Sequence, residues 1–167
     1  KIATEVRQVV GPLLFASPTA SGKSRQPKPV DPKVAGLIAA IRRGESPAVP
    51  KGMAGAADAA GSTLLHHAVA FGSVAAVKQL LAAGAPVNAT NRRRATPLHW
   101  AIHDAAKARL LIEAGADVQA KQADGRSVLY QAAFAGNATP VLRLLVEKGA
   151  DANAATANGQ TPLMAAA

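Results

Sequence analysis

The chain has 167 residues and a net charge of +9 at pH 7, and 49% of its residues are hydrophobic although only 3% are aromatic. This length suits one domain with a core of alanine, leucine and valine. Because cysteine is absent, disulfides, thiolate metal sites and a cysteine nucleophile are excluded, and no apolar run approaches the roughly 18 residues of a membrane span.

Residues 1–15 form an apolar N-terminal segment that is predicted to be an amphipathic helix. Its apolar residues fall at helical spacing, at Ile2, Val6, Val9, Val10 and Leu13. The helix either docks on the domain that follows or belongs to an upstream domain. An export signal is the alternative, but Glu5 and Arg7 interrupt its start, which favours the cytoplasm over export to the periplasm.

Residues 16–32 are rich in proline, serine and lysine and are predicted to be a linker. Within them, the stretch from Ser17 to Ser24 (SPTASGKS) resembles a phosphate-binding loop whose first glycine is replaced. Such a loop requires a helix that begins at its lysine, and Pro27 and Pro29 prevent that helix. We therefore interpret the stretch as a basic linker and predict no nucleotide hydrolysis.

Residues 33–60 are predicted to form a degenerate unit that caps the domain. Asp31 can cap a helix whose first position is Pro32, and one face of this helix is apolar, at Val34, Leu37, Ile38 and Ile41. Gly44 ends the pattern. A second helix is not expected, because Pro47 and Pro50 would break it.

The rest of the chain repeats one motif, Thr96-Pro97-Leu98-His99-Trp100-Ala101. Related stretches begin at Thr63, Ser127 and Thr161, so the steps are 33, 31 and 34 residues. The motif resembles the T-P-L-H-x-A opening of an ankyrin repeat, a family with a period of about 33 residues. The resemblance implies an all-α solenoid of stacked helix-turn-helix units with protruding loops. The full units are predicted at 61–93, 94–124 and 125–158, with a truncated one at 159–167.

Each position of the motif has a physical task. The Thr or Ser hydroxyl can cap the first helix, proline suits its first position, and a leucine should point into the core, at Leu65, Leu98, Leu129 and Leu163. Gly72 and Gly136 are predicted to end the first helix in a left-handed conformation. A second helix follows in each full unit and is ended by Gly84, Gly115 or Gly149.

Three departures from the pattern carry structural predictions. The second unit is two residues short, so it should be compressed near His103-Asp104-Ala105, and the third unit has one extra residue between Asn137 and Pro140. Arg94 stands where the other units have glycine. Because a positive φ would cost an arginine roughly 1 kcal/mol, we expect a different turn there.

No residues are predicted to catalyse a reaction or to bind a cofactor, a metal or a small-molecule substrate. His66 and His99 occupy the histidine position of the motif, where a structural role is expected. His99 and His103 are four residues apart, a spacing that suits a metal, but no third ligand accompanies them. Ser127 lacks a histidine partner and is interpreted as a helix cap.

The resemblance implies that a partner protein binds to the concave face and loop tips. Aromatic and arginine side chains are enriched at such sites. The predicted partner-binding residues are His67, Phe71, Arg92, Arg93, Arg94, Trp100, His103, Lys121, Arg126, Gln131 and Phe134. The alternative is that Trp100 and Phe134 pack between helices and that the arginine run is only solvated.

The positive charge predicts a partner with an acidic surface. Two other functions stay open: nucleic-acid binding, which no reading motif supports, and an array that positions a catalytic or redox domain of a larger protein. The chain stops midway through the first helix of a fourth unit, so further repeats or self-association are expected at this end. The alanine- and arginine-rich repeats resemble bacterial arrays more than vertebrate ones.

Overall fold

The computed structural model describes residues 31–166, and the predictions for residues 1–30 lie outside this range. The helices are α2 (Pro32–Arg42), α3 (Leu64–Phe71), α4 (Val74–Ala82), α5 (Pro97–Trp100), α6 (Ala105–Glu113), α7 (Val128–Phe134), α8 (Thr139–Glu147) and α9 (Pro162–Ala166). Residues 31–166 form no β-strand, and no helix among them is long and apolar enough to cross a bilayer. The predicted all-α architecture is confirmed.

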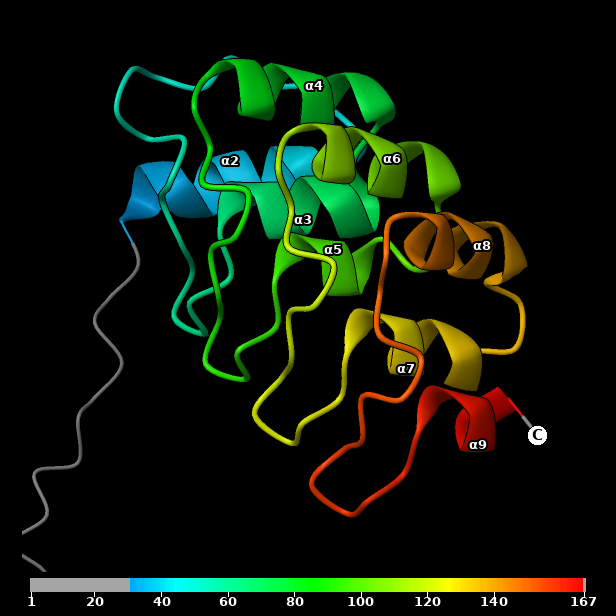
Figure 1. Ribbon diagram of the computed structural model, residues 1–167. Helices are drawn as coiled ribbons and strands as arrows, with labels where there is room; N and C mark the ends of the chain where they lie inside the picture. The colour runs from blue at the N-terminus through cyan, green and yellow to red at the C-terminus, as the bar shows by residue number, and fades with distance from the viewer. Residues whose placement is uncertain (1–30, 167) are drawn as a thin grey trace, which may run out of the picture.

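The helices stack in two layers, from which the loops project in one direction (Figure 1). The inner layer runs α2, α3, α5, α7, α9, and the outer layer runs α4, α6, α8. Each outer helix packs on the inner helix of its own unit and on its outer neighbours. The degenerate first unit contributes α2 alone, as the prolines predict.

The core consists of small and branched side chains at the predicted positions. Leu65, Leu98 and Leu129 are buried. The motif alanines of the full units, Ala68, Ala101 and Ala132, have no exposed surface, which lets neighbouring helices approach closely. The prediction for Leu163 is wrong, because this side chain is 79% exposed. In the full units an outer helix packs against the inner one, and α9 has no such helix within the described chain.

Helix starts follow the predicted caps, with one variation. Asp31 accepts a hydrogen bond from Lys33 N (2.8 Å), and Ser127 accepts one from Tyr130 N (3.1 Å). In the second full unit, a histidine completes the cap of helix α5. Nδ1 of His99 accepts a hydrogen bond from Thr96 N (3.2 Å) and lies 2.9 Å from the Thr96 hydroxyl. The imidazole therefore takes the place that a glutamate has in a capping box.

The predicted left-handed cap is wrong at Gly72 and right at Gly136. Gly72 has an extended backbone (φ −84°, ψ 177°), whereas Gly136 has a φ of 69°. A Cβ at position 72 would lie only 2.9 Å from the carbonyl oxygen of Ala68. Glycine is needed at position 72 for this close approach rather than for a positive φ.

The second unit is compressed where its missing residues predict. Helix α5 has 4 residues, against 8 in α3, and Asp104 caps the next helix by accepting from Ala106 N and Lys107 N. Lys107 then reaches back to the preceding unit, where its buried Nζ donates to the carbonyl of Val69 (3.0 Å). This contact fastens the first turn of α6 to the end of α3.

The loops end in four tight turns, which we call fingers, at residues 58–62, 91–95, 122–126 and 156–160. One backbone hydrogen bond joins each finger to the next: Arg92 N to Ala60 O (2.9 Å), Ala123 N to Arg93 O (2.9 Å) and Ala157 N to Asp124 O (3.0 Å). The expectation that Arg94 avoids a positive φ is wrong, because its φ is 58°. The finger keeps the turn of its neighbours and places arginine in it.

Candidate functional site

A groove of about 790 Å³ lies between the inner helices and the first three fingers. Its polar and aromatic lining consists of Arg42, Asp58, Ser62, His67, Asn91, Arg92, Arg93, Trp100, Gln122, Asp124, Arg126 and Gln131. Because the fingers are joined by backbone hydrogen bonds, these side chains are held on a connected framework.

Six of the predicted partner-binding residues line this groove, namely His67, Arg92, Arg93, Trp100, Arg126 and Gln131. The other predicted residues are exposed but do not line it: Phe71, Arg94, His103, Lys121 and Phe134. Phe134 is 70% exposed, so the alternative that it packs between helices is wrong.

Three charged lining residues were not predicted from the sequence, namely Arg42, Asp58 and Asp124. The sequence pattern could have predicted Arg42. Gly44 aligns with Gly72 and Gly136, which places Arg42 in register with Phe134, a predicted partner-binding residue. Asp58 and Asp124 reach the groove from the turns of the fingers, and their convergence depends on how neighbouring fingers pack against one another.

Trp100 is half-buried and lines the groove. Its ring meets His66 and His67 edge-on, with centroid distances of 5.4 Å and 5.9 Å. His67 was predicted to contact the partner, but its side chain is buried, with only 1% of its surface accessible. Its Nε2 lies 3.0 Å from Asp58 Oδ2, and its ring stacks on Phe71. His67 therefore supports the floor of the groove beneath Trp100.

The two carboxylates of the groove are engaged within the chain. Asp58 Oδ1 accepts from Ala60 N (2.8 Å) and Ser62 N (2.9 Å), and Asp124 Oδ2 lies 3.4 Å from Arg126 Nε. Burial raises the pKa of Asp58, but the hydrogen bonds from Ser62, His67 and Ala60 outweigh this effect and hold the pKa below its usual value. Asp58 is therefore ionised and already satisfied at neutral pH.

The arginines of the groove are less engaged. Arg42 lies over the ring of Phe71 (5.6 Å), and Arg126 is near Asp124. Neither Arg42, Arg92 nor Arg93 forms an ion pair with another residue in the range 31–166. The groove therefore presents an excess of positive charge.

The motif histidines are structural and neutral. Nδ1 of His66 accepts from Thr63 N (3.1 Å), so the ring hydrogen lies on Nε2, which donates to Ala95 O (3.0 Å) in the next unit. Burial lowers the pKa of His66, and it lowers that of His99 to about 4. The backbone of Arg126 partly offsets the effect at His99, although Nε2 of His99 makes no hydrogen bond of standard geometry with a described residue.

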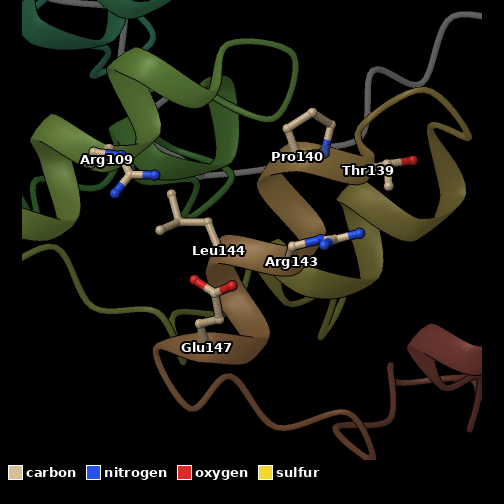
Figure 2. A pocket seen from close by; sticks show the side chains of 6 residues that line it. All are labelled: Arg109, Thr139, Pro140, Arg143, Leu144 and Glu147. Atoms are coloured by element: carbon tan, nitrogen blue, oxygen red, sulfur yellow. The ribbon is translucent and has the colours of Figure 1, made fainter.

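The described residues contain no group of three or more His, Asp or Glu side chains arranged to hold a metal ion. A second, smaller concavity of about 350 Å³ lies on the outer layer between α6 and α8. Figure 2 shows Arg109 on one helix facing Pro140, Leu144 and Glu147 on the other. It lacks the aromatic side chain and the fingers that distinguish the groove.

The family model described as "Ankyrin repeats (3 copies)" matches residues 37–122 and 106–167. The chain belongs to the ankyrin-repeat family. Ankyrin repeats generally mediate protein–protein interaction and are generally non-catalytic. No curated protein matches the chain.

Proposed function

We propose that this ankyrin-repeat array is a non-catalytic module that binds an acidic segment of a partner protein in the groove. One observation carries the proposal. The aspartates of the groove are satisfied by the chain itself, whereas Arg42, Arg92 and Arg93 pair with no described carboxylate. Carboxylates of a partner would supply the missing counter-charges, and bidentate contacts between arginine and carboxylate are strong and directional.

Trp100 adds contact area to this charge. It is the only tryptophan of the chain, and its half-buried ring lies among the arginines of the groove. Tryptophan and arginine are the residues most enriched at energetically dominant interface positions. The partner segment would lay apolar surface on Trp100 and place its carboxylates over Arg92 and Arg93.

The framework of the groove favours binding because it is formed in advance. The fingers are joined to one another by backbone hydrogen bonds, and Gln122 Nε2 donates to Gln131 Oε1 (3.1 Å) between a finger and α7. A site that is ordered before binding loses less conformational entropy on association. Most of the conformational entropy lost on binding would therefore come from the partner segment.

A pull-down from a lysate of the source cells tests this proposal. The parent chain is compared with the triple variant Trp100→Ala, Arg92→Glu, Arg93→Glu at low and moderate salt, after nuclease treatment. The matched control is Arg109→Glu, Arg143→Glu, which changes the charge on the outer layer. We expect the parent and the control to retain one discrete protein that the triple variant loses.

Circular dichroism confirms that each variant is folded. If the triple variant retains the same protein, the groove is not the binding site. A partner that disappears with nuclease treatment would indicate nucleic acid as the bridging molecule instead.

A further inference from the structure

The second finger contains an arginine where the other three contain glycine. Position 94 has a φ of 58°, and the equivalent glycines, Gly61, Gly125 and Gly159, have φ values of 79°, 80° and 76°. This left-handed region suits glycine, and a side chain there is strained. Arg94 is the only non-glycine residue with a positive φ among residues 31–166.

The backbone of the second finger does not require an arginine. Arg94 N donates to Asn91 O (2.8 Å), just as Gly61 N donates to Asp58 O (2.9 Å) and Gly125 N to Gln122 O (3.0 Å). The hydrogen bond from Ala123 N to Arg93 O also repeats the contact between the other fingers. Glycine would form the same turn without strain, so any benefit of Arg94 comes from its side chain.

That side chain is unused within the described chain. Arg94 is exposed and forms no ion pair, side-chain hydrogen bond or cation–π contact with another of residues 31–166. By contrast, Arg43 contacts Glu45 (2.7 Å), and Arg126 contacts Asp124 and lies over Tyr130. A strained residue with no internal contact indicates a role outside the chain.

We infer that Arg94 is a recognition residue for the acidic partner segment and that it extends the binding site from the groove over the tip of the second finger. This inference rests on the proposed function. Arg92 and Arg93 line the groove, whereas Arg94 is exposed and does not line it, so the three consecutive arginines extend the positive charge beyond the groove. An acidic peptide that lies in the groove and continues past the finger meets all three.

The length of such a peptide can be estimated. Ten extended residues span about 33 Å. Neighbouring packed helices lie about 10 Å apart, so this length crosses three units. A fluorescein-labelled peptide of ten glutamates is therefore a suitable probe, and its binding can be measured by fluorescence anisotropy at low salt.

Three variants separate the contributions. Arg94→Gly removes the side chain and the strain, the double variant Arg92→Gln, Arg93→Gln tests the groove, and Arg109→Gln is a control that removes one exposed charge from the outer layer. We expect Arg94→Gly to weaken peptide binding about fivefold while its Tm rises by about 3 °C. The double variant should lose at least tenfold, and Arg109→Gln should stay within twofold of the parent.

The outcomes distinguish this inference from the proposed function. If the double variant loses binding and Arg94→Gly does not, the proposal that the groove binds the peptide is supported and the role of Arg94 is refuted. If Arg94→Gly and Arg109→Gln weaken peptide binding equally, the effect is one of net charge, and the role of Arg94 is also refuted. If the parent does not bind the peptide, or binds a ten-residue thymidine oligonucleotide more tightly, both proposals fail.

Discussion

At the scale of single residues, the buried histidine His66 joins one unit of the array to the next. His66 accepts from its own helix cap through Nδ1 and donates through Nε2 to Ala95 of the following unit. The bond at Nδ1 needs the neutral ring, because a protonated Nδ1 cannot accept. His99 occupies the same position one unit later and is also buried. The folded array therefore excludes protons from these sites.

This exclusion predicts that the array loses stability as the pH falls below 6.5. Burial lowers the pKa of His99 from 6.5 to about 4, so between these values the unfolded chain binds a proton that the folded chain does not. Stability from this group is complete above the unfolded pKa and declines as the pH falls towards the folded one. From pH 7.5 to pH 5, His99 alone should cost about 2 kcal/mol, and His66 and His67, whose pKa values are also lowered, act in the same direction.

Urea unfolding at the two pH values measures this loss. The variant His99→Gln should be less stable at pH 7.5 but should lose about 2 kcal/mol less than the parent on acidification. Equal unfolding free energies of the parent at pH 7.5 and pH 5 would show that the histidines are not buried as neutral groups.

The sequence predicts the roles of residues that act within their own helix pair. It does not predict the conformation or burial of residues that depend on contacts with neighbouring units. Asp31, Ser127 and the motif leucines of the full units act within one helix pair, so a pattern of spacing locates them. Arg94 adopts a positive φ because the bonds between fingers hold the turn, and no local preference of arginine reveals this. Leu163 matches the core pattern and is exposed, because burial depends on a neighbouring helix.

At the scale of elements, the short helix α5 is compensated by a contact from α6. The buried Nζ of Lys107 donates to Val69 O at the end of α3 (3.0 Å) and lies 3.4 Å from Asp104 Oδ2. The compression was predictable from the residue count, whereas this contact between units was not.

We predict that Lys107→Met destabilises the array by about 1–2 kcal/mol, because it removes a buried hydrogen bond and leaves the Val69 carbonyl without this donor. The matched control is Lys78→Met on the outer helix α4, where the lysine is exposed. This control should change the unfolding free energy by less than about 0.5 kcal/mol. Chemical unfolding monitored by circular dichroism compares the two, and equal effects would contradict the role assigned to Lys107.

At the scale of the whole molecule, the groove is a product of stacking. It gathers side chains from α2, three fingers and the inner helices, and no single unit contains it. The family resemblance predicts a binding surface on the concave face, and six of the predicted residues line the groove. Arg42 and the two aspartates were missed because their convergence depends on how successive units pack. The excess positive charge of the groove, which supports an acidic partner, depends on Asp58 and Asp124 being engaged by other groups of the chain. The sequence alone does not predict these contacts.

The most direct test of the account is the selection of a random peptide library, displayed on phage, against the folded parent chain. The variant Arg92→Glu, Arg93→Glu serves for counter-selection. We predict that the enriched peptides are rich in aspartate and glutamate, lose binding to the variant and compete with one another for a single site. Enriched peptides without a negative charge bias, or peptides that bind the parent and the variant equally, would contradict it.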